Sequence, residues 1–196
     1  MPRAVPDLSL SHGQVLWALA RGRHPEPTMA DQVRYLRQLG VPFRPAELGR
    51  GRGNRLRYRY AHLIELGVAL FALRRGLKPR EIATLLVGKR KRLREIYRKA
   101  WCDQPEAAVA SEWAKSRGRI VPVLANELFL RLHDRYSAAP GTIELLGQDQ
   151  IRDLSQLVAL VEIYPGEEAR TLLPLTRLAL ELVAWAQEAP ELRTGP

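Results

Sequence analysis

The sequence predicts a mainly helical protein that carries one small basic β-hairpin, and three observations support this prediction. Along most of the chain, apolar residues recur at the three- and four-residue spacing of amphipathic helices. Glycine and proline stand between these segments, as they do at helix ends. Residues 55–60 depart from this pattern, because arginine and apolar residues alternate strictly there, as in a β-strand.

The basic hairpin is expected within residues 49–60, which read Gly-Arg-Gly-Arg-Gly-Asn-Arg-Leu-Arg-Tyr-Arg-Tyr. Arg55, Arg57 and Arg59 share one face of its strand, about 6.6 Å apart at a rise of about 3.3 Å per residue. The glycines before the strand permit the positive φ angles of a tight loop near residues 51–54. The inward face of the strand is formed by Leu56, Tyr58 and Tyr60. Such a strand suits a polyanion, although a cationic edge strand also prevents aggregation.

Two helices are expected before the hairpin. Ser11 precedes the first, and the break at residues 22–27 follows it. Thr28 and Asp31 stand at the spacing of a capping box, which predicts the start of the second helix. Gly40, with Pro42 close behind, predicts its end. The apolar stripes are Val15, Leu16, Leu19 and Ala20 in the first helix, and Val33, Leu36 and Leu39 in the second.

Two helices joined by a short break follow the helix-turn-helix plan, in which the second helix enters the major groove of DNA. Arg34, Arg37 and Gln38 supply the donors that such a helix needs. A solvated helix face has the same composition, so either interpretation fits a single residue.

Residues 62–75 predict an apolar core helix that ends at Gly76. We expect Leu63, Leu66, Leu70 and Leu73 to form the core of this half, with Leu56 and Tyr58 close by. Pro79 predicts the first turn of the next helix. The basic run at residues 88–92 is expected between two helices, as a second phosphate-contacting loop or a solvated charge run. A last helix follows through Trp101 and is ended by Pro105.

Three of these segments together resemble the MerR-type winged helix-turn-helix DNA-binding domain. Residues 33–41, Val-Arg-Tyr-Leu-Arg-Gln-Leu-Gly-Val, resemble its recognition-helix segment, and the glycine-bearing loop with the Arg/Tyr strand resembles its wing. Residues 76–86 resemble a further helix of that family. The resemblance covers roughly residues 10–100 and implies a DNA-binding domain over residues 10–104. The expected DNA-contacting residues are Thr28, Gln32, Arg34, Tyr35, Arg37, Gln38, Arg50, Arg52, Asn54, Arg55, Arg57, Arg59, Lys89, Arg90, Lys91 and Arg92.

Residues 105–190 are expected to form a C-terminal helical domain for dimerisation or partner binding. Apolar spacing predicts helices at 106–116, 120–136 and 149–163, and a long helix at 167–188 that is kinked or restarted at Pro174. Residues 142–146 fit a strand or a helix equally. The MerR-type family usually dimerises through a long helix, which Pro105 cuts short here. A homodimer is therefore expected through another stripe, Leu178, Leu182 and Trp185, which could equally close the monomer core.

Charge divides the chain into two halves. Residues 1–101 hold 22 Lys and Arg against 7 Asp and Glu, whereas residues 102–196 hold 9 against 14. This asymmetry predicts a polyanion-binding half and a mildly acidic half with another role. Cys102 is the only cysteine, so no intrachain disulfide can form and a reducing cytoplasmic location is expected. The longest apolar run, residues 66–73, is far shorter than the roughly 20 residues of a membrane span.

No pattern of catalytic residues is present in the sequence. The histidines at 12, 24, 62 and 133 have no partner at metal-ligand spacing. The Gly-Arg run lacks the Lys-Ser/Thr end of a phosphate-binding loop. We therefore expect no enzyme, metal or cofactor. The predicted function is sequence-selective duplex-DNA binding by a transcriptional regulator. An excisionase-like or plasmid-maintenance architectural role, RNA binding through the Gly-Arg stretch, and a helical adaptor with a merely solvated basic half stay open as alternatives.

Overall fold

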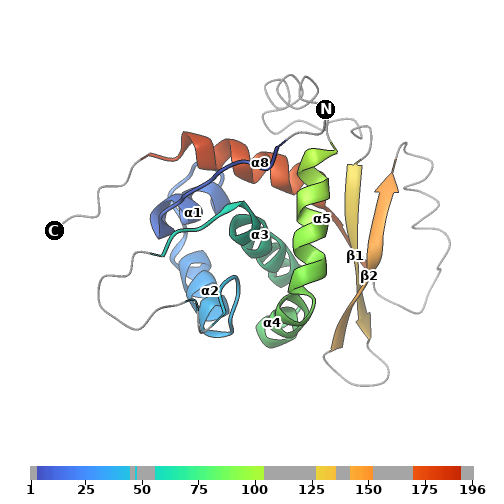
Figure 1. Ribbon diagram of the computed structural model, residues 1–196. Coiled ribbons are helices and arrows are strands. Elements are labelled where there is room, and N and C mark those ends of the chain that lie inside the picture. Colours follow the sequence, from blue (N-terminus) through green and yellow to red (C-terminus); the bar gives the residue numbers. More distant parts are fainter. Residues whose placement is uncertain are drawn as a thin grey trace. The chain divides into compact units, whose positions relative to one another are not determined.

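The computed structural model describes residues 4–44, 47, 56–103, 127–135, 142–151 and 170–190, and in these the protein is mainly helical. In chain order the first helices are α1 (His12–Leu19), α2 (Pro27–Gln38), α3 (Tyr60–Arg74), α4 (Pro79–Gly88) and α5 (Arg90–Cys102) (Figure 1). The chain divides into two compact units, residues 5–90 with 181–196, and residues 1–4 with 91–180. This division differs from the boundary expected after residue 104. No helix in the described ranges has the length and apolarity that crossing a bilayer requires.

The two N-terminal helices start in different ways. The α1 helix begins with a reciprocal cap, because the Gln14 backbone N–H donates to Ser11 Oγ and the Ser11 backbone N–H donates to Gln14 Oε1. At α2 the expected Thr28–Asp31 cap was wrong. Pro27 already occupies the first turn, where its missing N–H costs nothing, and Glu26 precedes the helix without a side-chain cap.

Glycines with positive φ end both α2 and α3, as the sequence predicted. Gly40 has φ +89° and Gly76 has φ +86°. Beyond Gly40 the Val41 N–H donates to the Leu36 carbonyl, and beyond Gly76 the Leu77 N–H donates to the Ala72 carbonyl. These are the bonds of the Schellman cap, which needs a left-handed residue and therefore favours glycine.

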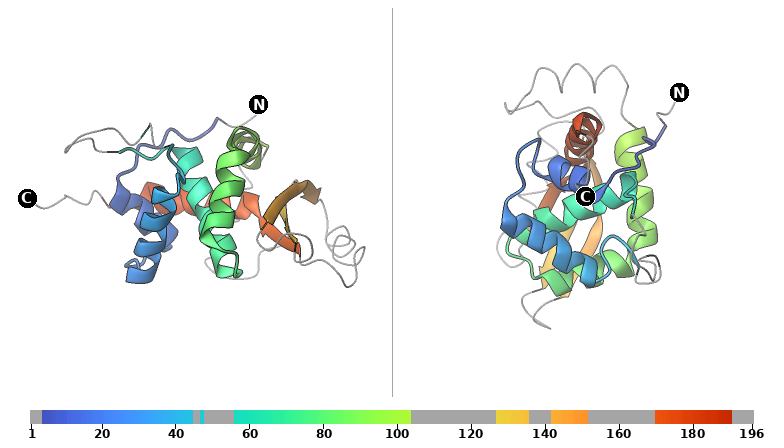
Figure 2. Two further views of the ribbon diagram at one scale, coloured as in Figure 1. Left: turned by 90° about the horizontal axis from the view of Figure 1, so that it is seen from below. Right: turned by 90° about the vertical axis from the view of Figure 1, so that its left-hand side faces the viewer.

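We call residues 5–90 with 181–196 the basic unit. Its core is built on α3, which contacts both α2 and α4 (Figures 1 and 2). Leu63, Leu66 and Leu70 are buried, as is Tyr58, so the predicted core is confirmed at these positions. Leu56 and Leu73 are only partly buried. The helix is apolar around most of its surface, which is typical of a helix covered on several sides.

The extended segment before α3 pairs with the N-terminal segment. Leu10 and Tyr58 form an antiparallel bridge in which each backbone N–H donates to the other's carbonyl, at 2.9 Å. Tyr58 points inward and Arg57 and Arg59 are exposed, as the alternation predicted, but residues 56–59 hold a single bridge and Tyr60 begins α3, so the hairpin strand expected over residues 55–60 was wrong at 56–60. The expected loop near residues 51–54 lies outside the described residues.

The basic run at residues 88–92 is not a loop. Helix α4 ends at Gly88 and α5 begins at Arg90, so only Lys89 stands between them. Helix α4 starts at Pro79 and α5 ends at Cys102, close to the positions that the sequence predicted.

The second half contains a sheet where helices were expected. An antiparallel sheet has the strand order β2-β1-β3, formed by β1 (Glu127–Arg135), β2 (Thr142–Ile151) and β3 (Arg170–Pro174). The helix expected at 120–136 is therefore wrong over β1, and the one expected at 149–163 is wrong up to Ile151. The helix expected at 106–116 lies outside the described residues.

The last helix, α8 (Leu175–Glu188), starts immediately after Pro174, where a kink or restart was expected, but the helix expected at 167–188 is wrong over Arg170–Pro174, which form β3. Within the basic unit, Glu181 pairs with Arg21 at 2.7 Å, and the Trp185 ring lies so close to Gly22 that an added Cβ would be 2.3 Å from it. Leu182 is buried, at 3 % exposure. The expected dimerisation stripe was Leu178, Leu182 and Trp185. Two of these three residues, Leu182 and Trp185, are thus packed within the chain itself.

Candidate nucleic-acid interface

Basic side chains from three separate segments meet at the start of α1. His12 is the first residue of that helix, and its Nδ1 lies 3.2 Å from the Tyr58 hydroxyl. Tyr58 packs edge-on against Phe43, with ring centroids 4.8 Å apart, which fixes the position of the phenol. The Arg57 guanidinium reaches the Ser9 carbonyl at 3.5 Å.

Two arginines of α2, Arg34 and Arg37, change pKa values at this contact. Burial lowers the pKa of His12 below its usual 6.5, and Arg37 and then Arg34 lower it further. Burial raises the pKa of Tyr58, while Arg37 opposes that rise. Arg37 therefore acts on both His12 and Tyr58, and Arg34 acts on His12. We call His12, Arg34, Arg37, Arg57 and Tyr58 the His12 cluster.

The exposed face of α2 is polar. Thr28, Asp31, Tyr35 and Gln38 are exposed on it, with Tyr35 at 39 %. Asp31 binds Arg34 at 2.8 Å, in an ion pair whose two side chains are both mostly exposed. Such exposed pairs contribute little to stability, so Arg34 can exchange this partner for another anion at small cost.

The other expected contact residues of α2 are less accessible. Gln32 and Arg37 are only partly exposed, and the Arg37 Nε is buried without a partner in the described part of the chain. Of the expected wing residues, Arg57 and Arg59 are exposed, whereas Arg50, Arg52, Asn54 and Arg55 lie outside the described residues.

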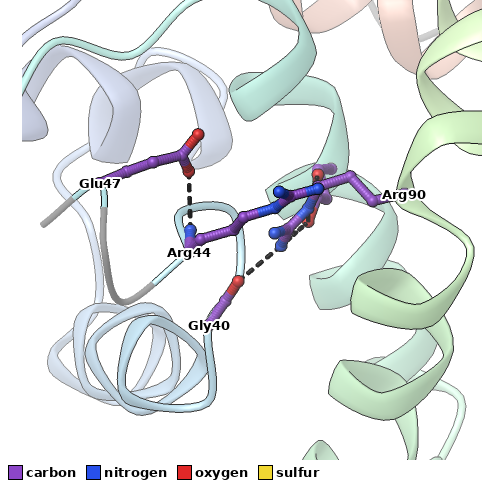
Figure 3. A network of polar contacts seen from close by, with 5 residues as sticks. Gly40, Arg44, Glu47 and Arg90 are labelled. Carbon is purple, nitrogen blue, oxygen red and sulfur yellow. Dashed lines mark hydrogen bonds and ion pairs between the residues drawn. The ribbon is translucent and has the colours of Figure 1, made fainter.

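Arg90 does not belong to an exposed surface, so its assignment as a DNA contact was wrong. It is 3 % exposed and donates to Glu65 from Nε at 3.0 Å and from Nη2 at 2.7 Å. Its Nη2 also donates to the Gly40 carbonyl, beyond the end of α2 (Figure 3). Lys89, Lys91 and Arg92, its neighbours in the basic run, are exposed.

The sequence contained a signal for this ion pair that the periodicity arguments did not use. Glu65 is the only acidic residue in the apolar helix Tyr60–Arg74, and it is 1 % exposed. A buried carboxylate needs a cationic partner. His12 was likewise not expected at the site, because its closeness to Tyr58, 46 residues away, depends on the bridge between Leu10 and Tyr58.

No group of three or more His, Cys, Asp or Glu that could hold a metal ion occurs among the residues with described positions. Comparison of the chain with protein-family models, with curated proteins and with solved structures found no match.

Proposed function

We propose that the protein is a sequence-selective duplex-DNA-binding protein, a transcriptional regulator of winged helix-turn-helix type. One observation supports this most strongly. The cations of α2 and of the extended segment converge at the start of α1, and Asp31 is the only carboxylate that forms an ion pair with them in the described part of the chain. A concentration of positive charge of this kind attracts a polyanion.

In this proposal α2 is the recognition helix and lies in the major groove. Its 12 residues span about 18 Å at a rise of about 1.5 Å per residue, and the major groove, about 12 Å wide, admits a helix. Arg34 donates to guanine and Gln38 to adenine, which are the pairings that their donors favour. Asp31 can accept from the amino group of cytosine.

Arg57 and Arg59 have a different role in this proposal. They are exposed beside the N-terminal segment and contact phosphates. Phosphate contacts position a protein on the duplex and carry no direct sequence information. Substitutions in α2 should therefore change sequence preference, and substitutions at Arg57 should change affinity for every duplex.

Selection of bound sequences from random duplexes, followed by affinity measurements on the selected and a scrambled duplex, tests the proposal. Arg34→Ala and Gln38→Ala should each reduce the discrimination between the two by about 1–3 kcal/mol. Arg57→Ala should weaken both equally and flatten the salt dependence by about one unit. Arg80→Ala, at an exposed arginine of α4, is the matched control and should change neither.

The proposal fails if selection enriches no sequence, or if Arg80→Ala alters discrimination as much as Arg34→Ala does. Preference for structured RNA over duplex DNA at equal salt would instead favour RNA binding. Asp31→Asn is a further variant for the same assay. It releases Arg34 from its ion pair and should tighten binding to the scrambled duplex.

A further inference from the structure

Helix α5 has two faces of opposite character. One face is buried and consists of Leu93, Ile96, Tyr97, Ala100 and Trp101. The other is exposed and carries Lys91, Arg92, Glu95, Arg98 and Lys99. At about 100° per residue, these five exposed positions fall within an arc of about 120°. We call the four cations, Lys91, Arg92, Arg98 and Lys99, the α5 basic face.

The α5 basic face has a fixed direction and spacing. Burial of the opposite face prevents the helix from turning, and Trp101 Nε1 donates to the Ala4 carbonyl at 2.8 Å. Lys91 and Arg98 are seven residues apart, as are Arg92 and Lys99, which places each pair about 10.5 Å apart along the axis. Two turns of helix thus present two rows of cations to the solvent.

No ion pair or hydrogen bond links these four cations to residues 4–44, 56–103 or 173–190. By contrast, Arg21, Arg34, Lys78 and Arg90 each have a carboxylate within 4 Å. Glu95 is the one acidic residue on the exposed face, and it forms no ion pair within the same described ranges. Within those residues, no carboxylate pairs with the α5 basic face.

We propose that the α5 basic face binds the phosphate backbone of duplex DNA without regard to sequence. A stiff duplex carries one negative charge per about 1.7 Å of axis, so rigid rows of cations match it without ordering a flexible strand. This surface goes beyond the reading of bases by α2 and does not require it. An acidic membrane is a poorer partner, because a helix that lies on a bilayer must insert its apolar face, which is buried here.

The test uses the full chain and a labelled scrambled duplex, with the dissociation constant measured between 50 and 200 mM salt. The triple variant Arg92→Gln/Arg98→Gln/Lys99→Gln removes three cations from the α5 basic face. Each phosphate contact contributes about 0.9 to the log–log salt slope, so the slope should flatten by about 2.7. The dissociation constant should then change about 40-fold less across that fourfold range of salt.

A second triple variant supplies the control. Arg23→Gln/Arg74→Gln/Arg80→Gln removes the same charge from exposed residues elsewhere. It should leave the slope within about half a unit of the unmodified protein, because diffuse net charge makes no phosphate contact. Circular dichroism of both variants verifies that the helices are retained, as expected for exposed positions.

Equal flattening by both triple variants would overturn the inference, because only net charge would then matter. An α5 variant with an unchanged slope on the duplex would also overturn it, and so would one that loses only its binding to structured RNA or to vesicles of anionic phosphatidylserine. Failure of the proposed function is a separate result. It appears as an absence of sequence preference, whereas this inference is measured on a scrambled duplex.

Discussion

Replacing Arg90 by methionine should destabilise the basic unit strongly. Among the described residues, Arg90 donates hydrogen bonds to Glu65 and to the Gly40 carbonyl. The substitution leaves the carboxylate of Glu65, 1 % exposed, without its guanidinium partner, and removes the donor to the Gly40 carbonyl. Loss of one member of a buried ion pair costs about 3–5 kcal/mol. At a urea dependence of about 2 kcal/mol per molar, the midpoint should fall by about 2 M.

The double variant Glu65→Leu/Arg90→Met separates the ion pair from ordinary packing. Removing both charges leaves the Gly40 carbonyl without the Arg90 donor, at about 1–3 kcal/mol. The double variant should therefore be more stable than Arg90→Met alone. Arg92→Met, at an exposed position two residues along the same helix, is the matched control and should change stability by less than about 0.5 kcal/mol. Urea titrations monitored by circular dichroism measure the stability of each variant. A loss below about 1 kcal/mol for Arg90→Met, or a double variant less stable than both single variants, would refute the reasoning.

Two further predictions concern the turn after α1 and the His12 cluster. Gly22→Ala should lower the free energy of unfolding by about 2–4 kcal/mol, because Gly22 has φ +69° and an added Cβ would lie 2.3 Å from the Trp185 ring. Gly88→Ala is the control, because no neighbouring group lies within 4 Å of the added Cβ, and it should lower the free energy of unfolding by less than about 0.5 kcal/mol. Equal losses for the two variants would contradict the contact between Gly22 and Trp185. The lowered pKa of His12 means that the unfolded chain takes up this proton first, so stability is full above pH 6.5 and falls as the pH drops below that value. Urea midpoints from pH 7.5 to pH 5 should fall more for the unmodified protein than for His12→Gln, and parallel curves would contradict this.

Sequence patterns predicted the basic half well because local rules determine its helix ends. Ser11 with Gln14, Gly40, Gly76 and Pro79 act through bonds or steric limits within a few residues. The start of α2 was missed at Thr28, because Pro27 offered an equally local alternative one residue earlier.

The acidic half was mispredicted because its spacing was ambiguous. Leu128 and Leu132 are four residues apart, which fits one face of a helix, but a separation of four also fits one face of a strand. The intervening Leu130 completes the alternation of a strand and is fully buried in β1. Arg90 was misassigned for another reason. The residues next to Arg90 in the sequence do not indicate that it pairs with the buried Glu65, which is 25 residues away.

The contacts of α8 with the turn after α1 have a consequence for how the chain folds as it is made. Arg21 and Gly22 are synthesised early, but Glu181 and Trp185, which contact them, are separated from the rest of their unit by residues 91–180. At about 5–20 residues per second, a ribosome needs roughly 5–20 s to make that interval. During this time the nascent basic unit lacks the helix that completes it, and a fragment ending at Asp103 would remain in that incomplete condition permanently.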